Sequence, residues 1–161
     1  MSGTIEGLDC VPGRITLNGA RFLLVRPETL VGFQKAVERE AGDVAKRCLM
    51  AGGVDGGGRS ARRLCDGGLK GREVVEAMGR MGTQIGWGRF RVESYGDAGF
   101  VIAVESSPYA EAYGASQMPV CHFLAGVAQG IGEAVYGAAT VSEVSCASAG
   151  ATACRFEVTK S

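Results

Sequence analysis

The stretch EVSCASAGATAC, residues 143–154, decides how the end of this chain must fold. Together with Cys121 it supplies three thiols and one carboxylate in the order C-x21-E-x2-C-x7-C. Three thiolates and a carboxylate form a complete tetrahedral ligand set for zinc, which takes cysteine sulfur at about 2.3 Å. Four protein ligands leave no position for water or substrate, so the sequence predicts a structural rather than a catalytic zinc site. Its ligands are Cys121, Glu143, Cys146 and Cys154.

This ligand set makes two demands on the local backbone. Cys121 follows Pro119 by two residues and is expected in the first turn of a helix, where the helix dipole favours a thiolate and lowers its pKa. Glu143 and Cys146 are three residues apart, and an odd offset in a regular strand sends two side chains to opposite faces. We therefore expect the strand to end or bulge near Val144-Ser145.

Other interpretations of these residues stay open. Cysteine is among the most buried residue types, so small buried thiols could explain the whole set. That interpretation is preferred for Cys10, Cys48 and Cys65, since Cys48 falls on an apolar helix face and none of the three has a partner at ligand spacing. His122 is adjacent to Cys121, and neighbours on a helix point about 100° apart, so we expect His122 to be packed or solvent-facing rather than a ligand.

Length and charge limit the function classes. With 161 residues and 46% hydrophobic content, one domain spanning 1–161 is expected. Seventeen basic and seventeen acidic residues cancel, so nothing in the overall charge favours nucleic acid. Met1–Cys10 lacks the features of a secretory signal, which predicts a cytoplasmic protein with reduced thiols. Polar side chains interrupt the apolar stretch 119–140, which predicts a core helix and no membrane span.

The N-terminal part, residues 1–50, is expected to form a hairpin and a helix. Apolar runs flank Asn18-Gly19 within Arg14–Val25, which is typical of a tight β-turn. Pro27 suits a helix start, and apolar residues then recur at steps of three and four up to Leu49. The glycine-rich segment that follows predicts a flexible loop over residues 51–68.

Residues 69–159 are expected to carry the core. The patterns predict a helix over 69–85, an antiparallel pair over 89–93 and 100–104, a helix from Pro119, and closing strands over 140–147 and 153–159. Small residues line the last helix, which indicates a surface for packing or dimerisation. The fold class is therefore α+β, with a mixed antiparallel sheet packed against helices.

Several motifs together resemble the 4-vinyl reductase domain, a family of predicted hydrocarbon-binding proteins. The resemblance covers about Gly71 to Val158, and its motifs are Gly86-Trp87-Gly88, Val104–Ser107, Pro119–Phe123 and Glu143–Cys154. Members of this family include a bacteriochlorophyll biosynthesis protein and the sensor domains of phenol-responsive activators. The resemblance implies a ligand-binding fold like that of TRAPP vesicle-tethering subunits, commonly dimeric, with zinc (Zn2+) on the four residues named above.

The resemblance also implies a hydrophobic or aromatic small-molecule ligand. The residues expected to line its cavity are Trp87, Phe90, Ile102, Val104, Ala125 and Val141. The phenol sensors carry aromatic residues at or near three of these positions, where this chain has Val104, Ala125 and Val141, which favours a larger or more aliphatic ligand. Plain core packing explains the same six residues equally well.

Three hypotheses for function follow. The first is a non-enzymatic, zinc-stabilised, homodimeric sensor or carrier that acts through a downstream protein partner. The second is an accessory protein or reductase of tetrapyrrole metabolism, against which stands the absence of a dinucleotide fingerprint in the sequence. The third is a TRAPP-like dimeric protein-interaction module without a ligand.

Overall fold

The computed structural model describes residues 5–161. The first four residues of the segment expected to lack a secretory signal, 1–4, lie outside the described part. The main sheet has the order β4-β5-β7-β6, with every neighbouring pair antiparallel. Its strands are β4 (Arg89–Gly96), β5 (Gly99–Glu105), β6 (Ala139–Ser145) and β7 (Cys154–Lys160). The helices are α1 (Pro27–Ala41), α2 (Asp43–Asp66), α3 (Arg72–Gln84), α4 (Pro108–Tyr113) and α5 (His122–Tyr136), with a 3-10 turn η1 (Ala147–Ala149).

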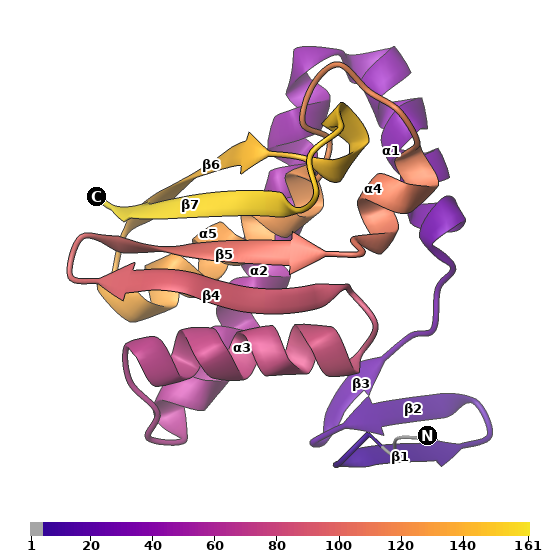
Figure 1. Cartoon of the computed structure of the whole chain (residues 1–161). Coiled ribbons are helices and arrows are strands. Elements are labelled where there is room, and N and C mark those ends of the chain that lie inside the picture. The colour runs from indigo at the N-terminus through magenta and orange to yellow at the C-terminus, as the bar shows by residue number, and fades with distance from the viewer. Residues whose placement is uncertain (1–4) are drawn as a thin grey trace.

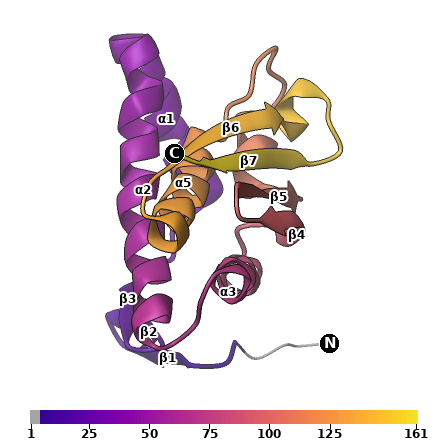
Figure 2. The same ribbon diagram turned by 90° about the vertical axis from the view of Figure 1, so that its left-hand side faces the viewer.

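The elements are stacked in layers. Helix α5 lies against one face of the main sheet, and α2 lies on the far side of α5 (Figure 2). Helix α3 runs beside β4 at the edge of the sheet (Figure 1). The core forms between these layers from Val74 and Val75 of α3, Phe100 and Ile102 of β5, and Phe156 of β7, all at most 2% exposed. This arrangement confirms the predicted α+β class.

The predicted N-terminal hairpin is present and belongs to a small separate sheet. Strands β2 (Arg14–Leu17) and β3 (Ala20–Phe22) are joined by Asn18-Gly19, whose φ values of 49° and 77° suit a tight hairpin turn. A further strand, β1 (Leu8–Val11), pairs with β2 and was not predicted. All of β1 is exposed, and the small sheet lies at one end of the molecule, below the main sheet in Figure 1.

The predicted glycine-rich loop over residues 51–68 is wrong. Residues 51–66 continue α2 as regular helix, while the chain bends earlier, at Gly42, where φ is 51°. Glycine lowers helix stability by about 0.5–1 kcal/mol per residue in isolation. Here the missing side chains let α2 approach α5 closely: a Cβ on Gly53 would lie 2.8 Å from the backbone N of Val127, and one on Gly130 would lie 2.5 Å from the carbonyl O of Val54.

The same contact settles the use of the small residues on α5. Helices α2 and α5 make the most extensive contact of any two elements in the described chain. Gly126 and Gly130 of α5 face backbone atoms of α2, so this surface serves packing within the chain. It is therefore covered and is not free for a dimer partner.

Most other predicted elements are found close to their expected bounds. Helix α3 and the antiparallel β4–β5 and β6–β7 pairs are confirmed, whereas α4 was not predicted. Two cysteines differ from expectation, because Cys10 and Cys48 are exposed rather than buried. None of the helices within residues 5–161 combines the length and the apolar character needed to cross a membrane.

Candidate metal centre

Three sulfur atoms and a carboxylate meet where α5 begins, between the ends of β6 and β7. Cys121 is the N-cap residue of α5, Cys146 follows β6, and Cys154 opens β7. The Sγ atom of Cys121 lies 3.5 Å from that of Cys154 and 4.0 Å from that of Cys146. One ligand atom from each of the three cysteines and from Glu143 can be chosen so that all four lie within 4.8 Å of one another. This cluster of four residues could hold a metal ion.

A break in β6 allows Glu143 and Cys146 to face the same point. The pairing of β6 with β7 shifts register between Glu143 and Ser145, opposite Phe156 and Arg155. The irregularity lies at Val144-Ser145, where the odd spacing of the two ligands predicts it. It turns Cys146 toward the side on which Glu143 lies.

The spacing of the donors fits a tetrahedral ion. Sulfur atoms at about 2.3 Å from a central zinc are about 3.8 Å apart in a regular tetrahedron, and the three sulfur–sulfur distances here are 3.5, 4.0 and 4.0 Å. Oε2 of Glu143 accepts the backbone N–H of Cys121 at 3.0 Å. Oε1 of Glu143 is buried without a hydrogen-bond partner, which is costly for a carboxylate unless a cation binds it.

Protonation of the cluster points the same way. Hydrogen bonds to the sulfurs of Cys146 and Cys154, followed by burial, raise the pKa of the Cys121 thiol. The predicted lowering of that pKa by the helix dipole is therefore outweighed by its neighbours. Burial, reinforced by Cys146, raises the pKa of Glu143 to about 8. Four anionic groups repel each other in so small a volume, and a divalent cation would relieve that repulsion.

Neutral donors rather than Arg155 surround the cluster. The backbone N–H of Ala147 donates to Sγ of Cys154 at 3.4 Å, and the buried Ser107 hydroxyl lies 3.8 Å from Sγ of Cys121. The sequence suggested Arg155 as a compensating charge, but its guanidinium pairs with Glu93 at 3.0 Å. Amide and hydroxyl groups are the kind of outer contacts that orient metal ligands.

An apolar cavity lies on the side of α5 that faces α2 and α3. Its volume is about 70 Å³. Trp87 contributes to its wall, with its ring centroid 5.7 Å from that of Phe123. The lining residues are Phe22, Gly56, Gly57, Ser60, Met78, Met81, Gly82, Ile85, Trp87, Phe90, Phe123, Val127 and Ile131.

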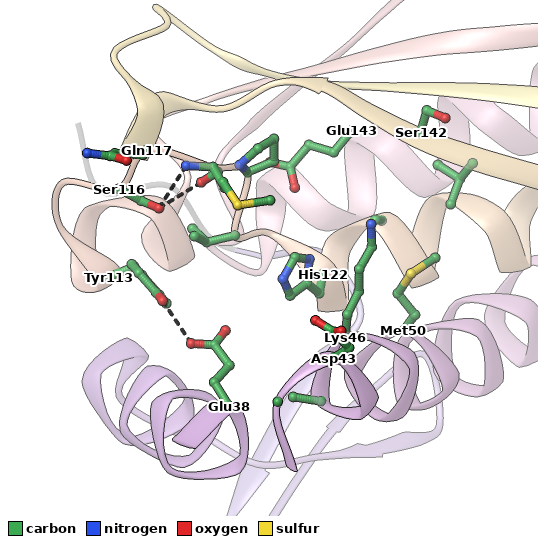
Figure 3. Close-up of a pocket in the computed structure, with 17 residues that line it drawn as sticks. Glu38, Asp43, Lys46, Met50, Tyr113, Ser116, Gln117, His122, Ser142 and Glu143 are labelled. Carbon is green, nitrogen blue, oxygen red and sulfur yellow. Dashed lines mark hydrogen bonds between the residues drawn. The ribbon is translucent and has the colours of Figure 1, made fainter. Parts of the chain in front are cut away.

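A second and larger depression, the polar groove, lies on the opposite side of α5 and has a volume of about 790 Å³ (Figure 3). It is bounded by the corner between α1 and α2, the segment 116–120, the start of α5 and the edge strand β6. Its lining residues are Glu38, Gly42, Asp43, Ala45, Lys46, Met50, Tyr113, Ser116, Gln117, Met118, Pro119, Val120, His122, Ala125, Val141, Ser142 and Glu143. The groove and the apolar cavity share no lining residue.

The six residues predicted to line one ligand cavity are divided among three places. Trp87 and Phe90 line the apolar cavity. Ala125 and Val141 line the polar groove. Ile102 and Val104, at 2% and 0% exposed, are core residues of β5 that line neither.

His122 lines the polar groove and does not belong to the four-residue cluster. Burial and the nearby Lys46 ammonium lower the pKa of its imidazole. The sequence placed His122 among packed or solvent-facing residues, and the structure finds it half-buried. The groove residues Glu38, Asp43 and Lys46 carried no sequence signal of their own, because each belongs to an ordinary polar helix face.

Comparison with known proteins supports the family resemblance. Residues 100–160 match the model of the vinyl 4-reductase domain, which confirms the resemblance for that part of the chain. No curated protein matches in sequence.

Solved structures agree in fold. The phenol-responsive sensory domain of the transcription activator PoxR, determined with phenol, superposes with a TM-score of 0.84 at 21% identity, over 96% of this chain and 85% of that domain. A vinyl-4-reductase family protein from Methanocaldococcus jannaschii gives a TM-score of 0.58 at 18% identity, over 87% of this chain and 83% of that one. Trafficking protein particle complex subunit 3 from Naegleria fowleri, covalently bound to palmitic acid, gives a TM-score of 0.59 at 15% identity, over 84% of this chain and 95% of that one. These similarities show the TRAPP-like α+β fold.

Proposed function

We propose that this protein is a zinc-stabilised domain that binds a small apolar or aromatic molecule and acts as a sensor or carrier. The observation that carries the proposal is the apolar cavity between α2, α3 and α5, with Trp87 and Phe90 in its wall. Small-molecule sites are concave and mostly apolar, as this one is. The fold shared with the phenol-responsive sensory domain of PoxR supports a sensing role.

The size of the cavity restricts the ligand. Its volume of about 70 Å³ is roughly half of the 150 Å³ at which an engineered apolar cavity holds benzene. Met78 and Met81 in the wall have flexible side chains that can repack around a guest. We therefore expect a ligand no larger than a single ring, smaller than the aliphatic residues at 104, 125 and 141 suggest. A tetrapyrrole does not fit.

The cluster of Cys121, Glu143, Cys146 and Cys154 supports zinc as the ion. Three thiolates favour a borderline-soft ion over calcium or magnesium, and a fourth protein ligand closes the coordination shell. When bound, zinc would tie the start of α5 to the ends of β6 and β7. Its role is structural, and ligand binding takes place in the apolar cavity.

Homodimerisation is part of the proposal, through the N-terminal part of the chain. Most of the large apolar side chains that are exposed lie between residues 8 and 33, on the small sheet, the linker and α1. Leu23, Leu24 and Phe33 are 75%, 87% and 64% exposed. Exposed apolar surface of this kind marks interaction sites, and a second copy would cover it. A signal from the ligand would then pass to a separate protein.

The test uses Trp87, the single tryptophan of the chain, as a reporter. Phenol and toluene should change its fluorescence in a saturable way, while glycerol should not. Ile85→Phe adds a ring at the cavity wall and should weaken binding about tenfold, whereas Val144→Phe adds the same ring to an exposed position and should not. Native mass spectrometry of the purified protein reports metal, oligomer and any retained ligand. Equal phenol binding by both variants would contradict the proposed site.

A further inference from the structure

The polar groove has features of a binding site that the proposed function does not use. Its volume of about 790 Å³ lies within the range of small-molecule sites. Its floor includes Met50, Ala125 and Val141, and its walls carry ionisable side chains. Because the groove shares no residue with the apolar cavity, a ligand here would be bound independently of the first.

Glu38 is a fixed carboxylate at one end of the groove. Its Oε1 accepts Nε2 of Gln34 and its Oε2 accepts the hydroxyl of Tyr113, each at 2.8 Å. Both donors are neutral, so neither cancels the negative charge of the carboxylate. Burial and the bond to Glu38 raise the pKa of Tyr113 to about 12, so its hydroxyl keeps donating at neutral pH.

The charges along the groove are predominantly negative. Glu38, Asp43 and Glu143 contribute carboxyl groups, and Lys46 is the single lysine or arginine in the lining. Within residues 5–161, no ion pair of 4.0 Å or less involves Glu38, Asp43 or Lys46. Lys35 lies close by but points elsewhere, donating to the carbonyl of Tyr113 and stacking on its ring.

The arrangement of these charges separates the two ends of the groove. Figure 3 shows Glu38 and Tyr113 on one side of His122, and Lys46 and Met50 on the other. Asp43 lies on the Lys46 side, where the two opposite charges offset each other. The Glu38 side therefore has a negative charge without a cation.

We infer that the polar groove binds a small organic amine, with its ammonium group beside Glu38 and an apolar body on the floor formed by Met50, Ala125 and Val141. An ammonium ion matches the fixed carboxylate and the hydroxyl oxygens of the wall. A carboxylic acid would meet three acidic groups and only one lysine. A neutral molecule would leave the Glu38 charge without a partner.

The experiment compares three probes of equal length: n-hexylamine, n-hexanoate and n-hexanol. Isothermal titration at pH 7 should give the amine about tenfold tighter binding than either of the others, since only the amine forms a charged hydrogen bond. Glu38→Gln should lower amine affinity about tenfold and leave hexanol unchanged. Glu40→Gln, an exposed acidic position of the same helix outside the groove, is the matched control.

Nuclear magnetic resonance locates the amine. Hexylamine should shift the backbone amides of Asp43, Lys46 and Ser142 and leave the indole N–H of Trp87 unchanged. Equal or tighter binding of hexanoate, equal binding of all three probes, or no amine binding at millimolar concentration would overturn the inference. So would an amine that shifts Trp87 alone, because it would then occupy the apolar cavity. The probe comparison on the unmodified protein remains decisive even if Glu38→Gln disturbs the fold.

Discussion

Replacing Gly53 with alanine should destabilise this protein, whereas the same change at Gly56 should stabilise it. Both residues lie inside α2, one turn apart in the glycine-rich segment. At Gly56 a new Cβ meets nothing within 4 Å, so only helix propensity changes. Alanine is favoured there by about 0.5–1 kcal/mol.

At Gly53 the new Cβ would meet the backbone of α5. It would lie 2.8 Å from N of Val127 and 3.0 Å from C of Gly126, and closer still to the carbonyl O of Phe123. Backbone atoms cannot rotate away, so the two helices must separate along their whole contact. Overpacking of this kind costs about 1–3 kcal/mol and exceeds the gain in helix propensity. The two variants should therefore differ by roughly 2–4 kcal/mol.

Urea denaturation followed by circular dichroism measures this difference. With an m-value of about 2 kcal/mol/M, the midpoints of the two variants should lie about 1–2 M apart, on opposite sides of the unmodified protein. Unchanged m-values would show that both variants unfold from a comparable state. A Gly53→Ala protein as stable as the unmodified one would refute the close helix contact and restore the interpretation of this segment as a loop.

Three further outcomes are expected. Cys154→Ser should lose the bound metal and lower the melting temperature by about 10 °C, for a tie worth about 3–4 kcal/mol, while Cys65→Ser keeps its metal; full metal content in the first variant would rule out the four-ligand set. In metal-free protein, the raised pKa of Glu143 means that the folded state binds its proton more tightly than the unfolded state, so stability should fall as pH rises from 4.5 to about 8; Glu143→Gln should flatten that pH profile, and an unchanged slope would argue against it. Leu24→Glu should convert a dimer into a monomer of 16.7 kDa in light scattering, Val144→Glu should not, and identical masses for both would exclude the N-terminal surface.

The metal cluster was predictable because its chemistry is local to a few residue types. Cysteine and glutamate at Cys121, Glu143, Cys146 and Cys154 limit the ions that suit them, and the odd offset of two ligands requires the break that β6 shows. Alternation and turn residues were likewise sufficient for the β4–β5 and β6–β7 pairs.

The glycine-rich helix was not predictable from local preference. Glycine disfavours helix in isolation, and the compensating contact is with α5, some 70 residues further along the chain. A signal was nevertheless present: Gly53 and Gly57 are four apart, as are Gly126 and Gly130, the spacing that places residues on one helix face. Two such pairs in one chain indicate a close crossing of helices.

The cavity residues failed for a different reason. Apolar periodicity identifies which residues of α5 are buried, but not which neighbouring element each one meets. Ala125 and Val127 are two positions apart on α5 and line different spaces. Assignment to one or the other depends on where α2 and the segment 116–120 lie, which no pattern within α5 specifies.

Helix α5 begins at the candidate metal centre and separates the apolar cavity from the polar groove. A rigid rod that forms one wall of both spaces is a natural carrier of heterotropic linkage. Thermodynamic reciprocity then applies: any factor by which zinc raises the affinity for a guest is the factor by which that guest raises the affinity for zinc. A cell that alters its free zinc would thereby retune the concentration at which this protein responds to its ligand.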